Sequence, residues 1–175
     1  MNRLHRGGTM RLHGWDYQSP GLYFVTICAK IRRQNIFGFI HNGYMCLSNM
    51  GQIVHNEWLL TEEIRPNVGL DQFIIMPDHM HAIIKIKYKM NTIKTVDTSR
   101  RDVSTNNHDV PTNYSTPYPI HIVYQRPRLL PNSLGSIINQ FKSQCTKRIR
   151  AIGQAGFQWQ SRYHEHLIRS QQELD

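Results

Sequence analysis

Two histidines separated by one residue, His79 and His81, are the side chains with the clearest potential for chemistry. In a β-strand, side chains two positions apart lie on the same face, about 6.5–7 Å from each other. Two imidazoles in that arrangement can bind one divalent cation, and ligand softness favours zinc or manganese over magnesium. Met80 would then point to the opposite face, into a core. Two ligands do not complete a site, so a third protein group or substrate oxygens must contribute.

Three other residues, one next to this pair and two with the same spacing, are candidates for supporting roles. Asp78 either accepts a hydrogen bond that orients the His79 imidazole or caps the turn after Pro77, and the sequence leaves both alternatives open. His164 and His166 repeat the spacing of the first pair and would also share one face of a strand. The plainer interpretation is that this second pair serves the surface or the packing.

Positively charged residues form a second group of candidates. The 21 Lys and Arg residues against 12 Asp and Glu give a net charge of +9, which favours a polyanionic partner such as nucleic acid or an anionic membrane surface. A basic helix is expected over 134–152, and no acidic residue occurs between Gly135 and Gly156, which favours contact with phosphates. Trp159, Tyr163 and Arg162 add possible stacking groups for unpaired bases. The predicted DNA-binding residues are Lys142, Lys147, Arg148, Arg150 and Arg162.

Composition argues against several classes of protein. The longest apolar runs, such as 73–76, stop far short of the ~20 residues of a membrane-spanning helix. The three cysteines, Cys28, Cys46 and Cys145, are odd in number and scattered, which is typical of reduced thiols rather than of a disulfide scaffold or a structural zinc site. The N-terminus lacks the apolar core of a signal peptide, so we expect a cytoplasmic protein without membrane contact.

The periodicity of the apolar residues predicts the elements that must position these side chains. Strands are expected over 22–29, 69–75 and 79–87, an Asn-Gly hairpin within 36–47, an extended segment over 157–170, and helices from Ser48 or Asn49 to Pro66 and over 134–152. This order indicates an α+β sandwich, with helices on one face of a mostly antiparallel sheet.

Three segments fall outside this pattern. Residues 1–21 are predicted to form a basic N-terminal arm, which leaves 22–175 as the domain. Residues 90–131 contain five of the eight prolines and no glycine, and we expect them to be a long disordered loop insertion. The run from Ser170 to Glu173 matches a capping box, which is a helix start signal, yet the sequence ends at Asp175. A missing C-terminal helix is therefore expected.

Four motifs in order, 23–28, 73–81, 135–138 with 141–143, and 159–169, carry a resemblance to a known family. They resemble the REP-associated tyrosine transposases, which are HUH single-strand transposases of the insertion-sequence-200-like type. The resemblance covers roughly 14–88 and 132–175 and skips the insertion, where the family also varies.

This resemblance implies a ferredoxin-like α+β domain that binds single-stranded or hairpin DNA, as a monomer or homodimer, at the nucleoid of a bacterial cytoplasm. It implies that His79 and His81 hold magnesium or manganese, which polarises and orients a scissile phosphodiester. Asp78 and His166 are then expected to support the ligands. A tyrosine hydroxyl attacks the phosphorus in the family, giving a 5′-phosphotyrosine intermediate and a free 3′-OH.

The sequence departs from the family at its C-terminal end. The family's nucleophile and third metal ligand come from one helix, shortly after the segment that matches 166–169, so both are expected to lie beyond Asp175. Tyr163 matches an aromatic position ahead of His166 and not the nucleophile. It is therefore a weak substitute, for which packing or stacking is the expected role.

Three functions follow as alternatives, and their products differ. A DNA transposase that cleaves and rejoins strands would form a covalent protein–DNA product. A DNA-hairpin-binding protein without chemistry would bind and form none. An unrelated metallohydrolase using His79 and His81 to activate water would hydrolyse its substrate without an adduct, and would need a carboxylate base such as Asp78 or Glu165.

Overall fold

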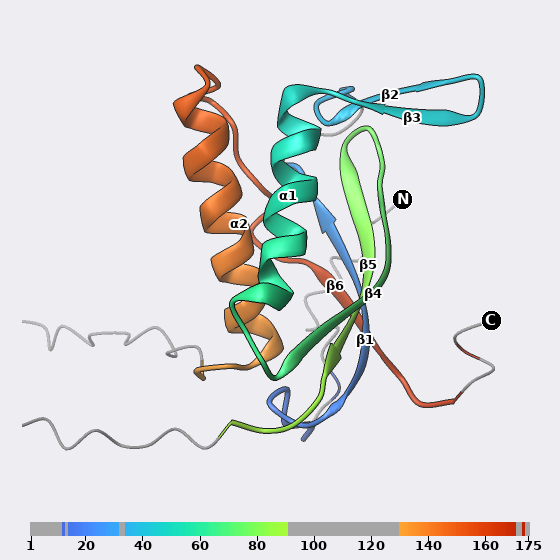
Figure 1. The fold of residues 1–175 in the computed structure, drawn as a ribbon, viewed down its shortest axis with the longest axis vertical. Helices are drawn as coiled ribbons and strands as arrows, with labels where there is room; N and C mark the ends of the chain where they lie inside the picture. Colours follow the sequence, from blue (N-terminus) through green and yellow to red (C-terminus); the bar gives the residue numbers. More distant parts are fainter. Residues whose placement is uncertain (1–11, 13, 32–33, 91–129, 171–172, 174–175) are drawn as a thin grey trace, which may run out of the picture. The chain divides into compact units, whose positions relative to one another are not determined.

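A four-stranded antiparallel sheet forms the frame of the domain (Figure 1). The computed structural model describes residues 12, 14–31, 34–90, 130–170 and 173. The strands stand in the order β4-β5-β1-β6, and all neighbours pair antiparallel. Their bounds are Gly21–Cys28 for β1, Val68–Ile75 for β4, His79–Ile86 for β5 and His164–Ile168 for β6.

Two helices, α1 (Asn49–Glu63) and α2 (Leu134–Ala151), cover one face of this sheet (Figure 1). Each begins after a serine, Ser48 or Ser133, whose hydroxyl accepts a backbone N–H from three residues further on. α2 ends just before Gly153, whose φ of 90° is the left-handed conformation that closes a helix. The predicted α+β fold, with helices on one face of an antiparallel sheet in the ferredoxin-like manner, is confirmed.

The strands separate core from surface by strict alternation. On β1, Tyr23, Val25 and Ile27 are fully buried against the helices, and on β5 Met80 is fully buried as well. The residues between them point to the other face, where Phe24 is 37% exposed. We call this second face, which neither helix covers, the open face of the sheet (Figure 1).

A short hairpin, β2 (Gly38–His41) and β3 (Tyr44–Leu47), precedes α1. Its turn residues Asn42 and Gly43 have φ values of 50° and 80°, the pair of positive values that a two-residue hairpin turn of the primed type requires. The Asn-Gly hairpin predicted from the sequence is therefore confirmed.

Two predicted segments lie largely outside the described residues: the basic arm over 1–21 and the insertion over 90–131. At the described end of the arm, the Tyr23 hydroxyl accepts a hydrogen bond from Trp15 Nε1 at 3.1 Å and donates one to the Ser19 carbonyl at 2.8 Å. This part of the chain is thus attached to the core. No helix in the described ranges is long and apolar enough to cross a membrane.

The turn between β4 and β5 is fixed from two sides. The Ala29 N–H donates to the Asp78 carbonyl at 2.9 Å, and the Phe37 N–H donates to the Pro77 carbonyl at 2.9 Å. The Phe37 carbonyl in turn lies so close to Gly51 in α1 that a Cβ at this glycine would overlap it. The first turn of α1 therefore helps to position the turn that carries Asp78.

We predict that Gly51→Ala destabilises the domain by about 2–3 kcal/mol, because the added methyl displaces the Phe37 loop. Thermal or denaturant unfolding measures the effect. Gly156→Ala is the matched control, since a Cβ at that position meets nothing within 4 Å. Equal stabilities for the two variants would contradict the close approach.

Candidate functional site

The two histidines of β5 converge on the open face of the sheet. Their Nε2 atoms lie 3.2 Å apart, and their rings are nearly perpendicular at 83°. Two imidazole ligands of one metal ion, each at about 2.0–2.1 Å from it, are separated by about 3.0–3.4 Å. The distance between the Nε2 atoms of His79 and His81 thus fits a shared cation.

Each imidazole is oriented through its other nitrogen. Asp78 Oδ1 lies 2.6 Å from His79 Nδ1, so the carboxylate can accept the Nδ1 proton and leave the Nε2 lone pair available for a cation. Of the two roles that the sequence leaves open for Asp78, the hydrogen bond to His79 is present in the structure.

Thr26 is a functional candidate that sequence reasoning missed. It pairs with His81 across the β1–β5 ladder, and its hydroxyl lies 2.8 Å from His81 Nδ1. If the hydroxyl accepts the Nδ1 proton, His81 Nε2 is free to bind a cation. If it donates instead, His81 Nε2 carries a proton and donates to His79 Nε2. The pair can therefore satisfy its hydrogen bonds both with and without a metal ion.

The environment of His81 favours the neutral imidazole that a metal ligand requires. Burial, and secondly the neighbouring His79, lower the pKa of His81 from its ordinary value. Phe24 contributes to this environment, because its ring stacks on the imidazole at a centroid distance of 5.4 Å and an angle of 20°.

The described residues do not supply a third ligand. No group of three His, Cys, Asp or Glu side chains in the described ranges has metal-binding geometry. A cation held by His79 and His81 would therefore take its remaining ligands from elsewhere, including water or substrate oxygens.

The second histidine pair lies on the same face but on the edge strand. His164 is opposite Thr26 and His166 is opposite Phe24, so β1 separates both from the first pair. His166 Nε2 lies 3.2 Å from Glu173 Oε2, which also accepts the Arg169 N–H at 2.8 Å. Both hydrogen bonds lower the pKa of Glu173, and the bond from the Arg169 backbone N–H has the larger effect. In the structure, the side chain of His166 therefore contacts the Glu173 carboxylate.

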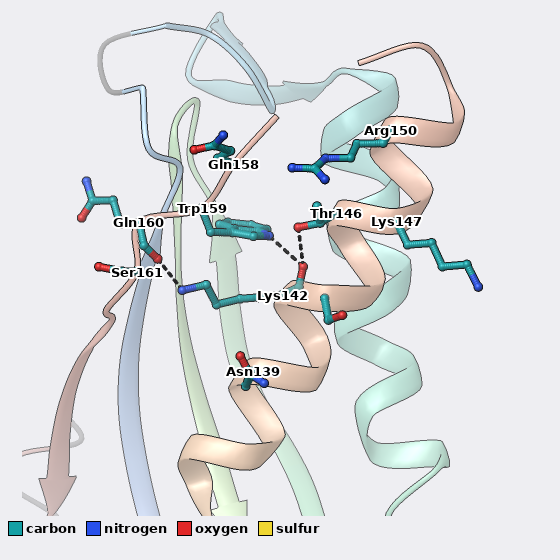
Figure 2. A pocket seen from close by; sticks show the side chains of 10 residues that line it. Asn139, Lys142, Thr146, Lys147, Arg150, Gln158, Trp159, Gln160 and Ser161 are labelled. Atoms are coloured by element: carbon teal, nitrogen blue, oxygen red, sulfur yellow. Dashed lines mark hydrogen bonds between the residues drawn. The ribbon is translucent and has the colours of Figure 1, made fainter. Parts of the chain in front are cut away.

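The predicted DNA-binding cations lie in three different places. Lys142, Lys147 and Arg150 line a groove of about 670 Å³ between α2 and residues 158–161, which we call the α2 groove (Figure 2). Arg148 instead forms an ion pair with Glu57 of α1, at 2.5 Å. Arg162 is exposed on the segment leading into β6. Arg148 therefore connects the two helices, whereas the other three basic residues of α2 line one cavity.

The aromatic residues proposed for base stacking belong largely to the core. Trp159 is only 9% exposed, packs against Phe37 and Phe157, and donates its Nε1–H to the Lys142 carbonyl at 3.1 Å. A stacking role for Trp159 was therefore a wrong prediction. Tyr163 packs against the hydrophobic core, on the side of the sheet away from His79.

Of the comparisons with known proteins, the one with solved structures bears on the fold. No protein-family model matches the chain. An uncharacterized protein of Haemophilus influenzae is 29% identical over 168 residues, which are 96% of this chain and 82% of that protein. A solved structure of a REP-associated tyrosine transposase bound to a REP hairpin matches with a TM-score of 0.52 and 16% identity, over 94% of this chain. The match spans 66% of that structure's chain, just under two thirds. The domain thus has the fold of a REP-associated tyrosine transposase.

We predict that in the metal-free protein the His81 imidazole titrates below the ordinary histidine value of about 6.5. The pKa of His81 is lower in the folded protein than in the unfolded one, so the folded state favours the neutral imidazole. The stability linked to this ionisation is therefore fully present above about pH 6.5 and is lost as the pH falls through the folded-state pKa. An NMR titration of the histidine ring protons in the presence of a chelator measures this, with His81→Gln for assignment. A midpoint at or above 6.5 would contradict the burial argument.

Proposed function

We propose that this chain binds single-stranded or hairpin DNA and holds a divalent cation, manganese or magnesium, between His79 and His81. In this proposal it is related to the metal-dependent tyrosine enzymes that cleave and rejoin DNA strands. One observation carries it: two imidazole Nε2 atoms converge to 3.2 Å on an open sheet face. The fold shared with a transposase that was solved with a REP hairpin supports the DNA partner.

The residues of the open face would have three different roles at such a site. His79 and His81 would hold the cation, while Asp78 and Thr26 would fix the orientation of the two rings through their Nδ1 atoms. When bound, the cation would polarise a phosphodiester oxygen as a Lewis acid. Phe24 and Ile74, which are 37% and 53% exposed, provide apolar surface on the same face for a nucleotide.

Strand cleavage by this route also needs a tyrosine at the reacting phosphate. The phenol oxygen forms a bond to phosphorus as the bond to the 3′ oxygen breaks, while the phenol loses its proton and the 3′ oxygen gains one. Tyr163 packs on the core side of the sheet, and the histidine pair lies on the other side. This placement favours a second candidate function, binding of a DNA hairpin without cleavage by Tyr163.

The metal site can be tested by Mn²⁺ binding, measured by calorimetry. We expect His81→Gln to abolish measurable binding, and Thr26→Val to weaken it by roughly 10-fold or more, because the ring loses its oriented tautomer. Thr26→Ser keeps the hydroxyl and should bind almost as the wild type does. Wild-type affinity in His81→Gln would exclude the proposed site.

The DNA partner and the chemistry can be tested together with a labelled single-stranded DNA hairpin and Mn²⁺. We expect a shifted band on a native gel, stronger than for a blunt duplex of equal length, and no Tyr163-dependent band on a denaturing gel. No native shift would overturn the proposed function. A denaturing-gel adduct that disappears in Tyr163→Phe would instead establish cleavage by this tyrosine and contradict its packing role.

A further inference from the structure

The α2 groove is separate from the histidine pair. One of its walls, residues 158–161, extends the sheet edge beyond β6: the Gln160 N–H donates to the Cys28 carbonyl, and the Lys30 N–H donates to the Gln158 carbonyl, both at 2.9 Å. Cys28 in turn lies opposite His79 in the β1–β5 ladder. The groove and the histidine pair are therefore near the same end of β1. They lie on different faces of the sheet, because α2 packs on the helical face and the histidines are on the open face.

Two of the three basic residues that line the groove donate to backbone carbonyl groups. Lys142 Nζ donates to the Gln160 carbonyl, and Arg150 Nη2 donates to the Phe157 carbonyl at 3.2 Å. In Figure 2 both side chains reach from α2 toward the opposite wall, while the end of Lys147 points away from it. An ammonium has three N–H donors and a guanidinium five, so each group retains donors after these bonds.

Three cations among the described residues pair with carboxylates: Arg148 with Glu57, Lys87 with Glu62 and Lys89 with Asp16. The ion pairs of the described residues include neither Lys142 nor Arg150. Lys142 is also half-buried, and burial lowers its pKa. A partly desolvated ammonium facing a cavity without a carboxylate is a favourable partner for an external anion.

The remaining lining residues favour a phosphate over a base. The other side chains, Asn139, Ser143, Thr146, Gln158, Gln160 and Ser161, are all polar and uncharged. The aromatic ring among the lining residues, Trp159, is 9% exposed and packed in the core. The groove thus offers charge and hydrogen-bond donors but little stacking surface, which suits the backbone of a nucleic acid.

We propose that the α2 groove binds backbone phosphates of the DNA, through Lys142 and Arg150, as a contact distinct from the histidine pair. A bound strand crosses the sheet edge at residues 158–161, so that one DNA molecule engages both faces. This inference rests on the proposed function, because it takes DNA as the partner. Binding of DNA in the α2 groove is independent of the DNA sequence, since phosphates carry no base information.

Fluorescence anisotropy with two single-stranded hairpins of different sequence, each at several salt concentrations, tests this contact. We expect Lys142→Met to weaken binding of both hairpins by roughly 5- to 10-fold at low salt and to reduce the slope of log affinity against log salt by about 0.7–0.9. Lys89→Met is the matched control: it removes the same charge from a lysine paired with Asp16, beyond the opposite end of β5. Mn²⁺ binding should be unchanged in both variants.

A second variant covers the case in which Lys142→Met fails to fold. Ser143 is exposed on α2 and lines the groove, so Ser143→Asp adds a negative charge there without burying it. We expect at least a 10-fold loss of affinity for Ser143→Asp and little change for Ser143→Asn. If the wild type binds hairpins and the groove variants match their controls, the groove proposal is wrong and the proposed function stands. If the wild type binds no hairpin, the proposed function itself fails.

Discussion

The pairing register between β1 and β5 is the constraint on which the candidate site depends. In the observed register Thr26 is opposite His81 and Cys28 is opposite His79. Met80, which lies between the two histidines in the sequence, is fully buried on the other face. Because side chains alternate along a strand, a slip of one residue would place both imidazoles in the core and Met80 on the open face. Burial of the apolar residues under α1 and α2 opposes that slip. Burial of these apolar residues therefore stabilises the core and also fixes the face on which the two imidazoles lie.

The second constraint is local and acts on the turn before β5. The Asp78 carboxylate can orient His79 only if the turn is held, and backbone hydrogen bonds from Ala29 and Phe37 hold it from two directions. Ala29 follows β1 directly, whereas Phe37 belongs to the loop that packs against Gly51 of α1. The orientation of one candidate ligand is thus coupled to the sheet and to the helical layer. A substitution far from the histidines can therefore change their geometry.

The parts of this arrangement that depend on local sequence were predictable, and the parts that depend on tertiary pairing were not. Ser48 or Asn49 marked the start of the first helix, and alternation around His79 and His81 placed both on one face, because capping and side-chain period are local properties. Thr26 could not be found, since its contact with His81 requires the register of strands that are 55 residues apart. Arg148 was grouped with its neighbours on α2, but the packing of α2 on α1 pairs it with Glu57. Trp159 was similarly misread, because an aromatic residue beside a basic helix gives no local sign of its burial.

The two candidate sites lie on opposite faces of the sheet, and their residues suit different roles: the α2 groove suits binding of the DNA backbone, and the histidine pair suits chemistry at one phosphate. The cations of the α2 groove would attract any phosphate backbone, and salt would weaken that attraction. The histidine pair is oriented by Asp78 and Thr26, burial lowers the pKa of His81, and the pair would act at a single phosphodiester. Residues 158–161 join the two faces, because they form a wall of the groove and also pair with the end of β1 next to His79. A strand anchored in the groove would therefore be directed over this edge toward the histidines, at an orientation set by the sheet rather than by contacts with bases.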